Sequence, residues 1–460
     1  MLVHRRILHF LLALFAVTVV LLRVQPGQSA LRAAAEPSAA GQYESGVNLP
    51  ASGGMLERPF FSTRRDPAID YSDSPTTDVV ADLKRRMDEG SASIRFEGRG
   101  GYLSSVMEAL HVPVESQSVV FSKTSLQSHY ISPSNPRAIF YSDDVAVAFI
   151  PDAPLLEIAA LDPHQGMVFY SVVQKPSERP QILRTDSCLS CHEAHDTLDV
   201  PGMLVRSVGS GTGGEVLLDF ADFNSDHRSP YDQRWGGWFI TGKTGSARHL
   251  GNLMLDPTGS ASGKRALPVP LDSLDARFNL EGYPSHFSDV AAVLVLNHQM
   301  KLMNLLTRVG WETRIALDQL QKNPKERANA ERLIASDAAE LADYMLFVGE
   351  PQLPGKFEST SGFPAKFAST GPRDARGRSL RQLDLVTRLM RYPCSYMIYS
   401  PAFDGLPPAA RDAVYSRLWA VLSGQDKAAK YVRFSPDIRA AIVEILRETK
   451  TGLPAYFKPL

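Results

Sequence analysis

The chain has 460 residues, of which 44% are hydrophobic and 22% charged, a composition that is ordinary for a soluble globular protein. Its 49 basic and 50 acidic side chains leave a formal net charge of −1, so the charge balance predicts no nucleic acid and no anionic membrane surface as a partner. With only three cysteines, the fold must rely on a hydrophobic core, which excludes a framework built from disulfides.

Residues 1–35 have the pattern of an export signal. A short basic region at Arg5 and Arg6 is followed by an apolar run over residues 7–22 and then by small residues suited to cleavage. A membrane span needs about 20 apolar residues, so the run is slightly short. We expect a cleaved signal peptide, with an uncleaved inner-membrane anchor through residues 7–22 as the alternative. Both interpretations predict that the rest of the chain is periplasmic or otherwise exported.

The next part of the chain combines a linker with a segment of mixed structure. Residues 36–75 are rich in Ser, Pro, Gly and Ala and predict a flexible linker. Helices are expected over residues 77–90 and 102–110, the first with a good cap, acidic residues in its first turn and a closing glycine. Apolar and β-branched runs predict strands at 118–122, 138–150 (two strands with a turn at Asp143 and Asp144), 155–161, 167–173, 215–220 and 235–241.

From about residue 286 the hydrophobic pattern becomes helical. We expect an α+β fold, in which an antiparallel sheet within residues 76–285 is followed by a mainly helical domain over residues 286–460. Apolar residues at intervals of three and four predict helices at 290–321, 324–347, 379–390, 408–422 and 436–449, with a long loop over 351–378.

One short motif carries recognisable chemistry. Cys188-Leu189-Ser190-Cys191-His192 has the spacing Cys-x-x-Cys-His, which is the attachment signature of c-type haem. Two thiols three positions apart can add to the two vinyl groups of one porphyrin, and the adjacent imidazole can then bind the iron. The motif therefore predicts one covalent haem c, with thioether bonds at Cys188 and Cys191 and His192 as the proximal ligand.

Three other interpretations of the motif were weighed. A zinc site could use Cys188, Cys191, His192 and His195, but adjacent Cys191 and His192 are poorly spaced for one tetrahedron. A thioredoxin-like dithiol would need a βαβ context, which the sequence does not predict. A structural disulfide is the third. The predicted export favours haem, because haem c is attached on the outer side of the membrane.

The sixth iron ligand stays open between several candidates. His249 follows a Gly-rich loop, and Met203 is the nearest plausible methionine. His195 is too close to the motif to reach the opposite face of the iron, and His298 has the helical spacing of a core residue. An iron with an open sixth position is a further alternative. Two protein ligands favour electron transfer, whereas an open position permits ligand binding or catalysis.

The five-residue motif resembles that of c-type cytochromes, and the resemblance implies the roles given above for its two cysteines and its histidine. The chain differs from the small soluble cytochromes, which are mostly helical and carry the motif near the N-terminus. Longer stretches are similar to a group of uncharacterised exported bacterial haem c proteins, which brings no known activity. These stretches are Phe140-Tyr141-Ser142-Asp143-Asp144, Trp235-Gly236-Gly237-Trp238, Arg248-His249-Leu250-Gly251-Asn252 and Arg391-Tyr392-Pro393-Cys394-Ser395-Tyr396.

Together these features predict an exported monohaem c-type protein that transfers single electrons, and an electron carrier is favoured over an enzyme. Its partner would be a redox protein or a quinone-linked chain. The alternatives are a PAS-like haem sensor or ligand-binding module, and a haem oxidoreductase such as a peroxidase. Trp235 and Trp238 are expected as core residues at a tight bend, with packing on the porphyrin as the alternative, and Cys394 is expected as a buried small hydrophobe.

Overall fold

The computed structural model describes residues 64–218, 220–255 and 270–460. The predicted signal or anchor over residues 1–35 and the linker up to residue 63 lie outside this range. The last part of the expected linker is packed: Tyr71 is only 1% exposed, and its hydroxyl donates a hydrogen bond to the carbonyl of Met167 at 2.8 Å. The packed structure therefore begins before residue 76. Across the described ranges, no helix is both long and apolar enough to cross a membrane.

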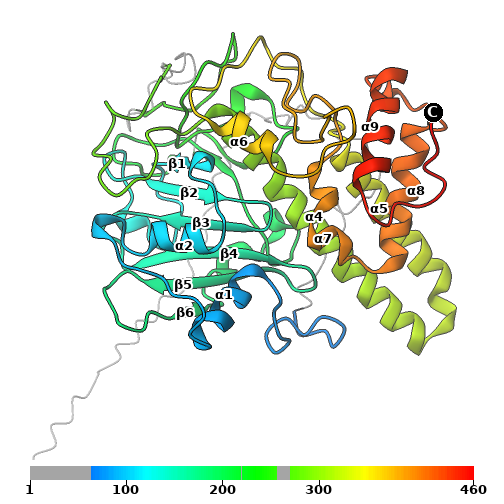
Figure 1. Cartoon of the computed structure of the whole chain (residues 1–460), viewed down its shortest axis with the longest axis horizontal. Coiled ribbons are helices and arrows are strands. Elements are labelled where there is room, and N and C mark those ends of the chain that lie inside the picture. Colours follow the sequence, from blue (N-terminus) through cyan, green and yellow to red (C-terminus); the bar gives the residue numbers. More distant parts are fainter. Residues whose placement is uncertain (1–63, 219, 256–269) are drawn as a thin grey trace, which may run out of the picture. The chain divides into compact units, whose positions relative to one another are not determined.

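An antiparallel sheet forms the first half of the described chain (Figure 1). Its strand order is β6-β5-β4-β3-β2-β1-β9, so strands that follow one another in sequence pair as neighbours as far as β6. A separate two-stranded ribbon pairs β7 (Arg206–Val208) with β8 (Asp222–Asn224). The strands of the large sheet are β1 (Ser118–Val120), β2 (Arg137–Tyr141), β3 (Val145–Phe149), β4 (Leu155–Asp162), β5 (Gly166–Val173), β6 (Ile182–Arg184) and β9 (Trp238–Phe239).

The two faces of the sheet meet different helices. Side chains alternate between faces along a strand, so Phe169 and Tyr170 of β5 point in opposite directions. Tyr170 faces α1 (Val79–Asp88), because its hydroxyl donates to the carboxylate of the capping residue Asp78 at 2.6 Å. Tyr141 lies on the face of Phe169, and its hydroxyl donates to the carbonyl of Ala292 in α4 at 2.6 Å.

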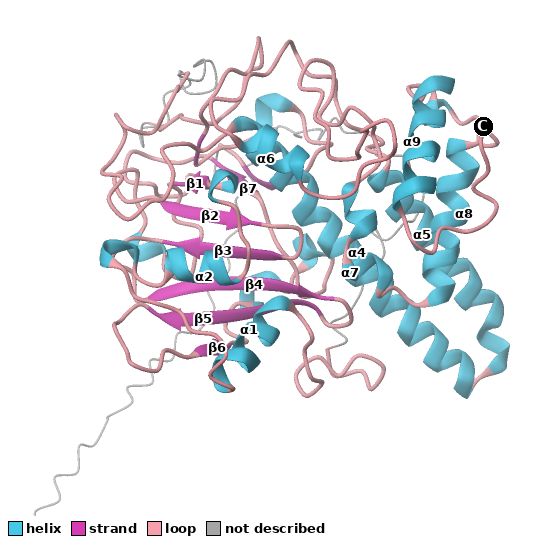
Figure 2. Cartoon of the chain, viewed as in Figure 1, coloured by secondary structure: helices cyan, strands magenta, loops and turns pink. Residues whose placement is uncertain are grey.

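The second half of the chain is mostly helical and is built around α4 (Val290–Lys322), which is coloured cyan in Figure 2 with the other helices. The carboxylate of Asp289 caps α4 by accepting the backbone N–H of Ala291 at 2.8 Å. This helix contacts both β5 and α5, and one hydrophobic core runs through the sheet and the helices. The expected boundary near residue 286 thus separates two kinds of secondary structure that share a core. The remaining helices are α2 (Leu103–Ala109), α3 (Leu189–His192), α5 (Arg327–Met345), α6 (Phe363–Ser369), α7 (Pro401–Asp404), α8 (Pro408–Leu422) and α9 (Pro436–Thr449).

The predicted α+β class is confirmed, but the helix expected over residues 379–390 is wrong. Leu383 and Met390 form an antiparallel bridge instead, and the backbone of Leu385 is left-handed with φ 58°. The carboxylate of Asp384 accepts hydrogen bonds from the N–H groups of Val386 and Thr387 at 2.7 and 2.8 Å. Such side-chain bonds to nearby backbone compete with helix formation, and here they stabilise a turn.

The loop expected over residues 351–378 contains the short helix α6. The strand expected at 215–220 is also wrong. The chain turns tightly at Gly214, whose φ is 84°, and folds back onto residues 209–211. Val216 then makes a single bridge with Ser210, and Leu217 donates its N–H to the carbonyl of Gly209 at 2.7 Å. The apolar residues of this stretch therefore serve a short turn, and the ladder forms farther out between β7 and β8.

Candidate functional site

The Cys-x-x-Cys-His motif forms one helical turn directly after the edge strand of the sheet. The turn is α3, and the N–H groups of Cys191 and His192 donate to the carbonyl of Cys188 at 3.1 and 2.9 Å. Residues three positions apart lie on the same side of a helix, so the turn presents both thiols in one direction. Cys188, Cys191 and His192 all line a single cavity between the motif and the sheet.

His192 is held in one orientation by the backbone that follows the motif. Its Nδ1–H donates to the carbonyl of Gly202 at 2.8 Å, and the N–H of Gly202 donates back to the carbonyl of His192 at 2.8 Å. The ring also packs against Phe169, with ring centroids 5.0 Å apart. Because a carbonyl can only accept, Nδ1 carries the proton and Nε2 keeps the lone pair that binds a metal.

The charge state of His192 suits a metal ligand. Desolvation by burial lowers the pKa of its imidazole, outweighing the hydrogen bond to Gly202, which raises it. A lowered pKa keeps the ring neutral at physiological pH, and neutral imidazole is the form that coordinates metals.

Helix α4 fixes the segment that holds His192. The side-chain amide of Asn304 accepts the N–H of Met203 at 2.8 Å and donates to the carbonyl of Met203 at 2.8 Å. Arg308, one turn farther along α4, donates to the carbonyl of Leu198 at 2.9 Å. A Cβ at Gly202 would lie 2.4 Å from the Asn304 Oδ1, so this close approach requires glycine. The long helix therefore positions the segment that orients His192.

The cavity beside the motif has a volume of about 310 Å³, within the range of ~300–1,000 Å³ found for sites of small organic ligands and cofactors. Its floor is hollow because small side chains face it from the central strands, namely Ala146 and Ala148 of β3 and Ala159 of β4. The rest of the lining is mostly apolar and includes Val120, Leu126, Ile139, Ile158, Phe169, Met203, Leu204 and Trp238.

Four charged side chains interrupt this apolar lining. Arg206 is paired with Asp222 at 2.6 Å outside the cavity, and Lys123 is exposed to solvent. Arg137 of β2 and Glu157 of β4 belong to the sheet floor, and their side chains are 17% and 23% exposed. The Nε of Arg137 is buried and makes no hydrogen bond within the described part of the chain. The cavity therefore contains a cationic donor that is not fully satisfied by the protein.

The two candidates for the sixth ligand differ in their position relative to the cavity. Met203 lines the cavity together with His192. His249 does not line it; its ring is 4% exposed, lies 4.9 Å from that of Trp235, and its Nδ1 accepts the N–H of Gly251 at 3.1 Å. His298 is a buried core residue as expected, with its Nε2 2.8 Å from the Ser395 hydroxyl. Of the two, only Met203 lines the cavity beside the motif.

The arrangement of the thiols gives no support to the other interpretations of the motif. Among the residues that the structure describes, no three His, Cys, Asp or Glu side chains converge as a metal site. Cys188 and Cys191 are both free thiols, and burial raises the pKa of Cys188 to about 11. A reactive dithiol needs a thiol with a lowered pKa, whereas the pKa of Cys188 is raised. Cys394 is fully buried, as predicted, and burial raises its pKa to about 12.

Several cavity residues were not identified from the sequence. These are Arg137, Glu157 and the floor alanines: Arg137 comes just before the strand predicted at 138–150, and Glu157 lies within the strand predicted at 155–161, where a charged residue is by itself typical of a partly exposed strand. Trp238, expected as a core residue with packing on the porphyrin as the alternative, is 3% exposed and also lines the cavity. Its indole N–H donates to the carbonyl of Arg206 at 2.7 Å, whereas Trp235 is buried and does not line the cavity.

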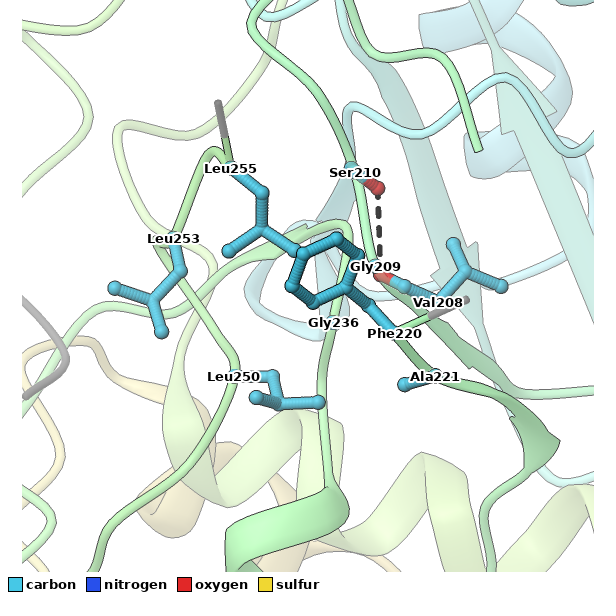
Figure 3. Close-up of a pocket in the computed structure, with 9 residues that line it drawn as sticks. All are labelled: Val208, Gly209, Ser210, Phe220, Ala221, Gly236, Leu250, Leu253 and Leu255. Carbon is cyan, nitrogen blue, oxygen red and sulfur yellow. Dashed lines mark hydrogen bonds between the residues drawn. The ribbon is translucent and has the colours of Figure 1, made fainter. Parts of the chain in front are cut away.

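A second, smaller pocket lies beside the β7–β8 ribbon (Figure 3). Its volume is about 30 Å³, enough for one or two water molecules, and Phe220 lies across it among leucine side chains. It contains no titratable side chain, so we assign it no chemistry. Its lining consists of Val208, Gly209, Ser210, Phe220, Ala221, Gly236, Leu250, Leu253 and Leu255.

No family profile, no curated protein and no solved structure matches this chain. The function of the chain is therefore inferred from the site itself. The residues present suit a covalent haem: two thiols and an oriented neutral imidazole share a largely apolar cavity, and the buried Nε of Arg137 has no hydrogen-bond acceptor among the described residues.

Proposed function

We propose that this chain is an exported monohaem c-type protein that transfers single electrons. The observation that carries the proposal is the 2.8 Å hydrogen bond from His192 Nδ1 to the carbonyl of Gly202, beside two thiols that line the same cavity. A metal-binding histidine commonly donates its second ring nitrogen to a carbonyl, which fixes both the tautomer and the ring orientation.

Each residue of the site has a defined role in this proposal. Haem c, when bound, would supply an iron that takes up and releases one electron. Cys188 and Cys191 would hold the porphyrin through thioether bonds, and Nε2 of His192 would bind the iron. The carbonyl of Gly202 accepts a hydrogen bond from Nδ1–H, which keeps the ring proton on Nδ1 and leaves Nε2 unprotonated. Phe169 and the alanine floor would exclude water from the porphyrin face.

Two features favour electron transfer over catalysis. Met203 lines the same cavity as His192, and an iron with two protein ligands has no open position for a substrate. Cys191 is exposed, and Leu126 at the cavity lining is 61% exposed, so one edge of the site reaches the surface. A partner could approach the cofactor there, and a periplasmic redox protein or quinone-linked chain remains the proposed partner.

A haem-based sensor is the second candidate, and one observation favours it. Asn304 of α4 binds the backbone of Met203, while the same helix packs against α5 in the helical half. A change in iron ligation at Met203 would thus act directly on an element shared by both halves. Binding of carbon monoxide to the reduced protein separates the candidates, because only an open or weakly held sixth position allows rapid binding.

The central test is covalent attachment. The full chain is produced in a bacterium competent for cytochrome c maturation, and the protein is stained for haem on a denaturing gel and weighed by mass spectrometry. We expect a stained band whose mass exceeds that of the polypeptide by one haem, and no stain in a Cys188→Ala, Cys191→Ala variant. A Cys394→Ala variant is the matched control and should stain like the parent. An unstained parent chain, or a stained double variant, would contradict the proposal.

A further inference from the structure

Arg137 crosses the floor of the cavity because the strand between it and Glu157 presents a small residue. Glu157 of β4 pairs with Ala148 of β3, which pairs with Ile139 of β2, and Arg137 lies on the same face as Ile139. Neighbouring strands are about 4.8 Å apart, so β2 and β4 are separated by about 10 Å. A long guanidinium side chain can bridge that distance only where the intervening side chain is as small as alanine.

The bridge leaves the guanidinium incompletely bound. The closest approach of the ion pair is 4.0 Å, between Arg137 Nε and Glu157 Oε2, which is too long for a hydrogen bond. The Ser125 hydroxyl donates to the other oxygen of Glu157 at 3.4 Å, which draws the carboxylate toward the loop. Buried donors in proteins nearly always have an acceptor. Within the described residues Arg137 Nε has none, so the acceptor is expected from whatever occupies the cavity.

The other two basic side chains at the cavity differ from Arg137. A terminal nitrogen of Arg206 donates to both carboxylate oxygens of Asp222, at 2.6 and 2.7 Å, so the charge of Arg206 is already neutralised. Lys123 is exposed and is hydrated by bulk water. Arg137 alone among these three combines enclosure in the floor with an unsatisfied donor.

We infer that Arg137 binds a propionate carboxylate of the haem, an inference that rests on the function proposed above. A guanidinium matches a carboxylate with two parallel N–H donors, which a lysine cannot do. Glu157 is then a positioning residue, because it holds Arg137 over Ala148 without satisfying it. The pair thereby selects a tetrapyrrole that carries free carboxylates on the rim that faces the sheet.

The test uses non-covalent binding, so that it doesn't depend on maturation. The full chain with Cys188→Ala and Cys191→Ala is titrated with ferric haem and with the ferric haem dimethyl ester, whose carboxylates are neutral, and binding is followed by absorbance. We expect haem to bind about tenfold or more tightly than the ester, as a charge-assisted hydrogen bond implies. If this double variant, in which Arg137 is intact, binds haem and the ester equally well, the inference is overturned.

Three further variants make the test specific. With Arg137→Gln the preference for haem over the ester should fall to near one, and with Arg137→Lys it should be intermediate. Arg206→Gln is the matched control and should retain the parent preference, because that guanidinium is already bound by Asp222. A preference that survives in Arg137→Gln, or that is lost in Arg206→Gln, overturns the inference.

The outcome is separable from that of the proposed function. If the chain with its cysteines intact stains for covalent haem but Arg137→Gln keeps the preference, only the role of Arg137 fails. If the intact chain never carries haem, the proposed function fails as well. Circular dichroism shows whether each variant folds. If an Arg137 variant does not fold, the comparison of haem with its ester in the double cysteine variant that keeps Arg137 decides the inference.

Discussion

The side-chain amide of Asn304 binds both backbone groups of Met203, accepting its N–H and donating to its carbonyl, each at 2.8 Å. The two residues are 101 positions apart in sequence, and Asn304 is only 1% exposed. Through this contact the long helix of the second half sets the segment whose Gly202 carbonyl orients His192. The helical half is thus part of the site.

Replacing Asn304 should loosen the site and destabilise the protein. We expect Asn304→Ala to lower the free energy of unfolding by about 1–3 kcal/mol, because two part-buried backbone groups of Met203 lose their partner. In the haem-loaded variant, the visible absorption bands that depend on the ligands of the iron should also be weaker. Denaturant unfolding and the visible spectrum measure the two effects. Asn329→Ala, on the exposed side of α5, is the matched control and should leave both unchanged.

Met203 and His249 can be separated as candidates for the sixth ligand. If Met203 binds the iron, Met203→Ala should change the spectrum of the oxidised protein and allow the reduced protein to bind carbon monoxide. His249→Ala should alter neither, because His249 does not line the cavity. If only His249→Ala had these effects, His249 and not Met203 would be the sixth ligand. A spectrum unchanged by either substitution would indicate another ligand or an open position.

The hollow floor gives a steric test. Ala146→Leu should abolish or strongly reduce haem loading, because the larger side chain would fill the cavity above β3 at a position away from Arg137. The free energy of unfolding of the haem-free chain should change by less than about 1 kcal/mol, since the added methyl groups enter open space rather than a packed core.

Ala160 provides the control for this test. It is fully buried and adjacent to Ala159, so it points to the other face of the sheet. Ala160→Leu should destabilise the haem-free chain by about 1–3 kcal/mol through overpacking. If the folded Ala146→Leu protein loads haem as fully as the parent, the assignment of this cavity to haem is wrong.

The buried His298 predicts sensitivity to acid. Burial lowers the pKa of His298 to about 3, whereas an unfolded histidine has a pKa near 6.5. Between these values the unfolded chain binds more protons than the folded one, so stability falls as the pH is lowered from 6.5 toward 3. This histidine should contribute a loss of about 2–3 kcal/mol between pH 7 and pH 4.5.

His298→Gln removes that group, because glutamine retains hydrogen-bonding groups but does not titrate, while the neighbouring His227, whose Nδ1 lies 2.8 Å from Nδ1 of His298, stays in both proteins. Urea unfolding of the haem-free parent and variant is compared from pH 7 to pH 4.5, where the carboxylates contribute to both proteins alike. We expect a shallower loss of stability in the variant. Parallel pH profiles would show that His298 is not the group that takes up the proton on unfolding.

The local features of the protein could be predicted from the sequence because they depend on residues close together in the chain. The Cys-x-x-Cys-His spacing brings two thiols and an imidazole into one helical turn, whichever fold surrounds it. The hairpin turn at Asp143 and Asp144, and the bounds of α4, α8 and α9, likewise follow from short-range periodicity and capping. The misplaced helix at 379–390 shows the limit, since a side-chain-bonded turn at Asp384 prevailed there over the apolar spacing.

Only the tertiary structure decided what surrounds the motif. The contact between Asn304 and Met203 and the bridge from Arg137 to Glu157 join residues that are distant in sequence, and they depend on strand register and on where α4 packs. A register shift of one residue would move Arg137 and the floor alanines to the opposite face of the sheet. Periodicity fixes which residues can share a face, but the packing of the whole core determines which face the motif meets.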